Sequence, residues 1–127
     1  MGWWVREPEL FAGEDVRWRR YASREQTALS QVGGRLFVTV TRMLFVPNRM
    51  DMATGGSEWE CALSDVSAVS VEPARLAVPF LGHAGKLRRR LRVELAGGDV
   101  ELFVVNHVDE AAEALREAIA GAMGQTS

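Results

Sequence analysis

The sequence has little of what disulfide-stabilised, metal-binding and membrane-spanning proteins require. Cys61 is the single cysteine among 127 residues, so an intrachain disulfide is excluded and a structural zinc cluster would lack its usual thiolates. No apolar run approaches the ~20 residues that span a bilayer. The N-terminus carries Trp3 and Trp4 but no basic segment followed by an apolar run, as a signal peptide would have. We therefore expect a cytoplasmic protein without a metal or cofactor.

Catalytic motifs are missing as well. His83 and His107 are the only histidines, too few with Cys61 to indicate a nucleophile–base pair. The pairs Gly33-Gly34 and Gly55-Gly56 lack the lysine and helix start of a phosphate-binding loop, so we interpret them as turns. Cys61 falls on the inward side of an alternating segment, where a thiol acts as a small hydrophobe. The sequence therefore predicts a protein that is not an enzyme.

Charge is low overall but unevenly distributed. The formal net charge is −2, and Lys86 is the one lysine among fifteen basic residues. Residues 74–98 contain six basic side chains and one acidic one, whereas residues 99–127 contain six acidic side chains and one basic one. Basic and aromatic residues also mix near Trp18, but the negative total charge argues against a nucleic-acid partner.

A β-hairpin is predicted over residues 91–104. Leu91, Val93 and Leu95 alternate with polar or small residues, the period of a half-buried strand. If Gly97-Gly98 forms a two-residue turn, Leu95 faces Val100, Val93 faces Leu102, and Leu91 faces Val104. Every apolar residue would then meet another on one face.

Five more alternating segments precede this hairpin. Val16 and Trp18 alternate with arginines in the first, and residues 35–46 form a second hairpin with a turn at Thr41-Arg42. Residues 58–61 place Trp59 and Cys61 inward, and residues 66–71 are rich in valine. About seven short strands separated by turn residues are typical of a β-sandwich or β-barrel.

The end of the chain changes to helical periodicity. Its apolar residues recur at spacings of three and four, at Val108, Ala111, Ala112, Leu115, Ala118, Ile119, Ala122 and Met123. Asn106 is the expected N-cap, with Asp109 and Glu110 in the first turn. A stripe this rich in alanine predicts a helix packed closely against a curved sheet or a barrel mouth.

The connection from residue 73 to residue 90 is the predicted contact surface. It is long for a small β domain, and its apolar residues are followed by clustered basic ones. That composition suits an anionic membrane surface, where each nearby arginine adds about 1 kcal/mol. The alternative is that its apolar residues cover one end of the core and its arginines are merely exposed. The candidate contact residues are Phe80, Leu81, Lys86, Arg88, Arg89 and Arg90.

Three short segments resemble the GRAM domains of the pleckstrin-homology superfold. They are Leu10-Phe11-Ala12-Gly13-Glu14, the run GRLFVTVTRMLF at residues 34–45, and Trp59-Glu60 followed by Leu63-Ser64-Asp65-Val66. Val40 departs from the pattern, which has an asparagine-type turn residue there. The resemblance implies a mainly β (α+β) fold: a bent, seven-stranded antiparallel sheet or partly open barrel, capped by one C-terminal helix. It also implies a scaffold that binds lipids or proteins.

These observations lead to one organisation and two candidate functions. We expect an N-terminal extension at residues 1–9, a GRAM-like domain at residues 10–120 and a tail at residues 121–127. The first candidate is an intracellular adaptor that engages a protein segment, or its own partner chain, at a sheet edge or in the groove beside the helix. The alternative is peripheral binding to anionic lipid through the segment 74–90. The sequence leaves the oligomeric state open.

Overall fold

The computed structural model describes residues 9–27, 30–48, 56–73 and 89–124. Its sheet comprises β1 (Val16–Thr27), β2 (Ser30–Thr39), β3 (Arg42–Pro47), β4 (Trp59–Ala62), β5 (Val66–Glu72), β6 (Arg90–Leu95) and β7 (Val100–Val105). The short 3-10 helix η1 (Leu63–Asp65) joins β4 to β5, and the helix α2 (Val108–Gly124) follows β7. The seven-stranded antiparallel sheet has the order β4-β3-β2-β1-β7-β6-β5, so the predicted fold class is confirmed.

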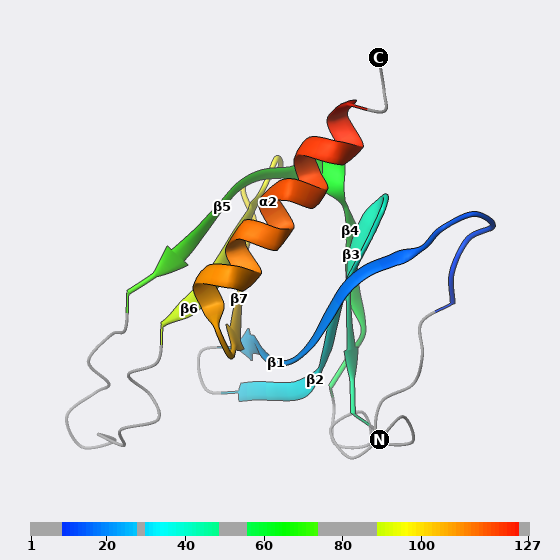
Figure 1. Cartoon of the computed structure of the whole chain (residues 1–127). Coiled ribbons are helices and arrows are strands. Elements are labelled where there is room, and N and C mark those ends of the chain that lie inside the picture. The colour runs from blue at the N-terminus through cyan, green and yellow to red at the C-terminus, as the bar shows by residue number, and fades with distance from the viewer. Residues whose placement is uncertain (1–8, 28–29, 49–55, 74–88, 125–127) are drawn as a thin grey trace, which may run out of the picture.

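The long strand β1 bends the sheet. It pairs with β2 along almost its whole length, but with β7 only from Ala22 to Arg24. Register shifts interrupt its ladder between Val16 and Trp18 and again between Glu25 and Thr27. Such irregularities increase local twist, and Figure 1 shows β1 curving between the two halves of the sheet.

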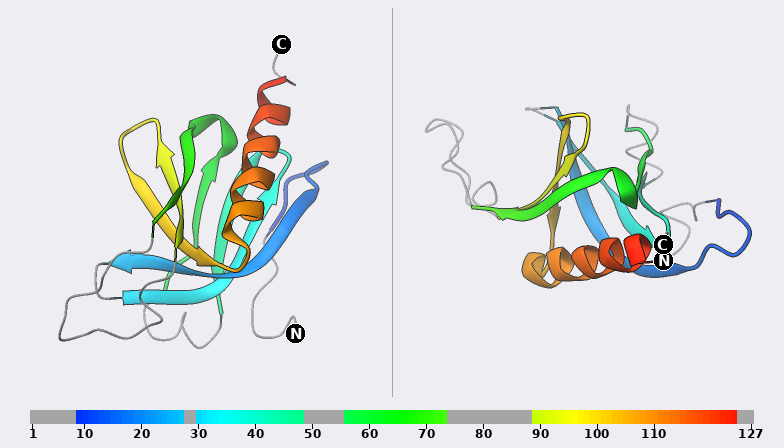
Figure 2. Two further views of the ribbon diagram at one scale, coloured as in Figure 1. Left: turned by 60° about the vertical axis from the view of Figure 1, so that its left-hand side comes forward. Right: turned by 90° about the horizontal axis from the view of Figure 1, so that it is seen from above.

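The concave side of the bent sheet contains the main core. Phe103 of β7 lies 6.0 Å from Phe45 of β3 and 5.6 Å from Trp59 of β4, measured between ring centroids. These strands are not neighbours in the sheet, so the aromatic rings meet across its interior. The helix α2 lies over this side, as the two views in Figure 2 show, and buries Val108, Ala111, Ala112 and Leu115. Its predicted apolar stripe is confirmed up to Ala122, whereas Met123 is 64% exposed.

The predicted register of the last hairpin is wrong by one residue. Leu91 faces Phe103 and Val93 faces Glu101, instead of Val104 and Leu102. The amide of Gly98 donates to the carbonyl of Leu95 at 2.9 Å, and Gly98 has a left-handed φ of 100°. The connection is therefore a three-residue loop with a left-handed glycine, and the additional residue exchanges the two faces of β7.

Gly33 and Gly34 lie within β2, not in a turn as predicted. Gly34 faces Ala22 on one side and Pro47 on the other. A Cβ atom at Gly34 would lie 2.3 Å from the carbonyl oxygen of Val46 and 2.7 Å from the Cα of Pro47. The strand β3 approaches so closely that only glycine fits there.

Three smaller expectations also change. The register shift in β1 places Val16 against Phe37, Leu44 and Val46 on the convex side, whereas Trp18 packs against the main core as predicted.

The turn between β2 and β3 is Val40-Thr41, because Arg42 already belongs to β3. The first helical hydrogen bond of α2 runs from the amide of Ala111 to the carbonyl of His107, so His107, with a φ of 53°, occupies the cap position expected for Asn106.

A comparison of two glycines tests the close approach at Gly34. We expect Gly34→Ala to lower the free energy of unfolding by about 3 kcal/mol or to prevent folding, because the added methyl group overlaps backbone atoms that cannot turn away. Gly97→Ala is the control, since a Cβ there meets nothing within 4 Å. Urea unfolding of both variants measures the difference, and equal stabilities would contradict this explanation.

Candidate functional site

A buried polar network ties the N-terminal segment to the sheet. One carboxylate oxygen of Glu14 accepts hydrogen bonds from the Thr39 hydroxyl at 2.6 Å and from Nε of Arg42 at 2.8 Å. The other oxygen accepts from the amide of Phe11 at 2.9 Å and from Arg42 at 3.0 Å. Arg42 also donates to Glu60 of β4 at 2.5 Å, and its guanidinium lies 4.2 Å from the Phe11 ring. Members of all three segments that resemble GRAM domains thus meet in one cluster, namely Phe11, Glu14, Thr39, Arg42 and Glu60.

The charges of this network are compensated. The hydrogen bond from Arg42 is the largest cause that lowers the pKa of Glu14 from 4.5 to about 2, and burial opposes the shift. The pKa of Arg42 is raised, chiefly by its hydrogen bond to Glu14. Neither group exchanges a proton near neutral pH, so the cluster orients strands and offers no acid or base for catalysis.

The predicted contact residues fall into two groups. Phe80, Leu81, Lys86 and Arg88 lie outside the described residues. Arg89 pairs with Asp109 of α2 at 2.8 Å, with both side chains more than half exposed.

Arg90 lies within the fold, in contact with acidic side chains. It forms ion pairs with Glu25 of β1 and, at 3.7 Å, with Glu72 of β5, and its side chain is 15% exposed. Arg92 continues the row, 3.7 Å from Glu72 and 2.8 Å from Glu94. Three arginines of the basic run therefore have carboxylate partners, which reduces the positive field that this side presents.

Sequence reasoning missed one more ion pair, inside the sheet. Arg24 of β1 donates to Glu101 of β7 at 2.9 Å, and its guanidinium lies 5.8 Å from the ring of Trp59. The register of β7 explains it, since Glu101 faces Val93 on the concave side. The predicted register assigned Glu101 to the outer face, opposite Glu94.

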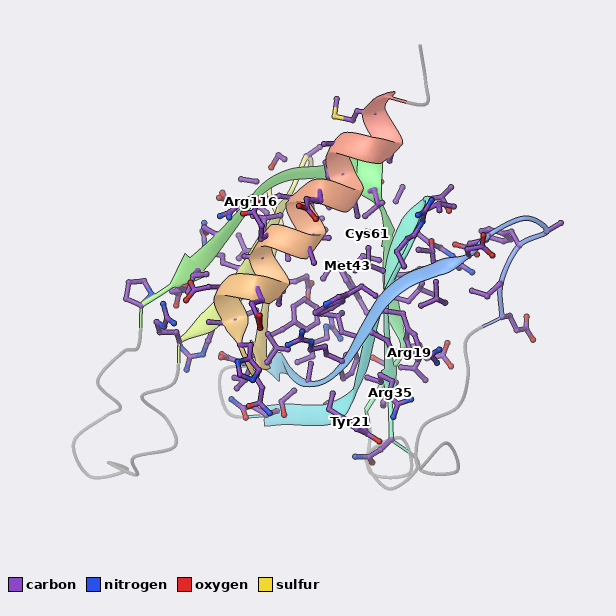
Figure 3. All side chains as sticks on the ribbon, viewed as in Figure 1. Arg19, Tyr21, Arg35, Met43, Cys61 and Arg116 are labelled. Atoms are coloured by element: carbon purple, nitrogen blue, oxygen red, sulfur yellow. The ribbon has the colours of Figure 1, made fainter. Side chains whose placement is uncertain are left out.

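Cys61 and His107 offer no nucleophile–base pair. Cys61 points into the fold beside Met43, its partner across β3 and β4 (Figure 3). Burial, followed by the nearby charges of Asp65, Glu101 and Glu60, raises the pKa of its thiol to about 12. His107 is exposed, and its ring lies 3.8 Å from Glu110. Across the described ranges, no three His, Cys, Asp or Glu side chains gather closely enough to hold a metal ion.

A groove between α2 and the first two strands is the candidate binding site. Its volume is about 320 Å³. Trp18, Val38 and Val40 line it from β1, β2 and the turn that follows β2, and small residues of α2 form the other wall, namely Ala114, Ala118, Gly121 and Ala122. Arg17 and Glu117 stand on opposite walls of this helix–sheet groove. An apolar floor with a few charges at the margin suits an amphipathic protein segment.

A second hollow is less suitable. It is larger, about 650 Å³, and is lined by residues 9–11 together with parts of β3 and β4. Arg42 and Glu60 lie in its wall, already joined to each other. A polar ligand there would compete with the internal network that holds the strands, so we favour the helix–sheet groove.

Solved structures resemble this fold. The N-terminal PH domain of Vps36 matches with a TM-score of 0.66 at 16% identity, covering 93% of this chain and 88% of that one. The C-terminal domain of an unknown protein from Leishmania infantum matches with a TM-score of 0.62 at 14% identity, covering 86% and 87%. The chain therefore has a pleckstrin-homology-like fold. A linker-DH/PH fragment of p115-RhoGEF agrees, with a TM-score of 0.58 at 8% identity over 87% of this chain and 30% of that one.

The sequence comparisons add no family. No protein-family model matches the chain, and no curated protein matches its sequence. None of the helical segments that the structure places has the length and hydropathy needed to cross a bilayer.

The depressed pKa of Glu14 predicts how stability depends on pH. A carboxylate whose folded pKa is about 2, below its ordinary 4.5, adds stability above pH 4.5 and loses it as the pH falls towards 2. At pH 6 we expect the free energy of unfolding of the wild-type protein to be about 2 kcal/mol higher than that of Glu14→Gln. This difference should disappear near pH 2, where the carboxyl group becomes protonated in the folded protein as well. Urea unfolding between these pH values measures it. Glu117→Gln, which alters an exposed carboxylate, is the control, and a gap independent of pH would contradict the assignment.

Proposed function

We propose that this chain is a non-enzymatic, intracellular GRAM-type binding module that engages protein through its helix–sheet groove. The apolar groove between α2 and the first two strands supports this function best. Its walls belong to the folded body and include neither Glu14 nor Arg42, although Thr39, which donates to Glu14, also lines the groove. An occupant could therefore enter without breaking the ion pair between Glu14 and Arg42. The lone cysteine fits a reducing compartment such as the cytoplasm.

The GRAM assignment rests on where the resembling residues lie. Phe11, Glu14, Thr39 and Arg42 come from two segments separated in sequence, yet they form one buried cluster. A resemblance that arose by chance would give no reason for these residues to meet. Their joint role, fastening the N-terminal segment to the β2–β3 hairpin, supports common descent of the motif.

A protein occupant also fits the geometry better than a small molecule does. The groove is open along the helix, with Val40 at the turn after β2 and Ala122 near the end of α2. Alanine and glycine on the helix wall let an incoming backbone approach closely, and the apolar floor accepts alternate or helically spaced side chains. Arg17 and Glu117 would orient the occupant.

Two alanines of α2 test the groove. A displayed library of short amphipathic peptides is selected on the wild-type protein, and the peptides obtained are titrated against variants. We expect Ala118→Arg, which fills the groove, to weaken binding about tenfold or more. Ala120→Arg places the same side chain on the exposed face of the same helix and should leave binding unchanged. Equal binding to both variants would contradict the proposed site, provided that both melt at similar temperatures.

A vesicle experiment tests the alternative function, peripheral binding to anionic lipid. Arg89 and Arg90 are ion-paired within the fold, so we expect no sedimentation with vesicles as their content of anionic phospholipid rises. Lys86→Glu with Arg88→Glu is the variant to compare, because it leaves the ion pairs of Arg90 intact. Sedimentation that increases with anionic lipid and is lost in this variant would favour the membrane function over the adaptor function.

A further inference from the structure

Two opposite charges flank the helix–sheet groove without partners. Arg17 on β1 and Glu117 on α2 are both exposed and line opposite walls. Within the described part of the chain, neither side chain takes part in an ion pair, a hydrogen bond or a ring contact. Other described arginines contact a carboxylate or a carbonyl, namely Arg20, Arg24, Arg42, Arg89, Arg90, Arg92 and Arg116.

The wall that α2 contributes suits a second helix. Ala114, Ala118 and Ala122 recur every four residues, so they form one ridge along the helix, and Gly121 lies beside it. The distance between two packed helices is set by the side chains at their contact, and residues this small permit a close approach. A helix with a similarly small face would therefore fit against this wall.

The same region provides such a helix. The last turns of α2 project beyond the strands in Figure 1 and in the left view of Figure 2. Gly121 and Ala122 in the last turn of α2 also line the groove. The groove and the projecting end of the helix thus lie next to each other on one surface.

We propose that a second copy of this chain occupies the groove, in a twofold symmetric dimer. A twofold axis places the same patch on both sides of an interface, so that Arg17 of one copy meets Glu117 of the other, and the reverse contact forms as well. The projecting ends of the two α2 helices pack antiparallel along their alanine ridges, so that each ridge lines the groove of the other copy. This inference names the partner for the groove and rests on the proposed function.

Apolar contact supplies most of the affinity in this arrangement. Exposed ion pairs contribute little to association, whereas like charges placed opposite each other exclude the wrong pairing. The two reciprocal pairs therefore set the register of the dimer. Because the helix wall is made of small residues, which bury little apolar area each, we expect reversible association that depends on protein concentration.

Charge reversal tests the proposal. Sedimentation equilibrium of the full chain is compared with Arg17→Glu, Glu117→Arg, the double variant carrying both changes, and an equimolar mixture of the two single variants. We expect wild-type protein to dimerise over about a hundredfold range of concentration, and each single variant to dimerise about tenfold more weakly or not at all. The double variant and the mixture should both dimerise like wild type, because each restores opposite charges in both reciprocal contacts.

Controls separate this effect from attraction by net charge. Arg35→Glu and Glu110→Arg carry the same charge changes outside the groove, and each should dimerise like wild type. A wild-type protein that is monomeric at every concentration would overturn the dimer, as would single variants that associate normally or a mixture that stays monomeric. Peptide binding sensitive to Ala118→Arg would still support the proposed function in those cases, so the two failures are distinguishable.

Discussion

The bend of β1 is the constraint on which the remaining structure depends. This strand joins β2 to β7, and only Ala22–Arg24 pairs with both neighbours. Once the strand bends, Phe103 of β7 approaches Phe45 and Trp59 from the other half of the sheet, and an enclosed core results. The helix α2 then has a concave apolar surface to cover, and its alanines allow it to lie close. The groove exists because α2 and the first part of β1 diverge where the bend carries β1 away.

Electrostatic compensation inside the fold decides which surfaces remain for a partner. Glu14 neutralises Arg42 in the network that holds the N-terminal segment. Glu25 and Glu72 approach Arg90, and Glu101 pairs with Arg24 inside the sheet. Arginines of the basic run at residues 86–92 thus form ion pairs within the fold, which the sequence alone does not show. Tyr21 and Arg35 on the outer face likewise contact each other, 4.4 Å from ring to guanidinium (Figure 3).

The sequence predicted the elements better than it predicted their pairing. Alternation identified the strands, and periodicity identified α2, because each signal is local and reflects one buried face. The register of β7 was missed because it depends on the loop conformation at Gly98, where a single left-handed residue exchanges the faces of a whole strand. The role of Gly34 was missed for a similar reason, since the close approach of Val46 belongs to a neighbouring strand.

The candidate site was only partly foreseeable. A sheet edge or the groove beside the helix was the contact expected for the adaptor function, and the structure offers such a groove. The two charged residues at the margin of the groove were not expected, because Arg17 and Glu117 are far apart in sequence and resemble many other exposed charges. Only the fold shows that one stands on each wall and that, among the residues the structure describes, neither side chain has a partner of opposite charge.

This lack of compensation favours the groove over the basic segment as a site of recognition. An exposed charge in water costs the monomer little, so stability does not require that Arg17 and Glu117 be paired. Charges already paired within a fold must lose a partner before they can engage another molecule, whereas unpaired charges at the margin of an apolar surface can do so at no such cost. The apolar floor drives association, and the two charges determine its orientation. A surface that carries both signs across one groove is complementary to itself, which is the property that a twofold interface needs.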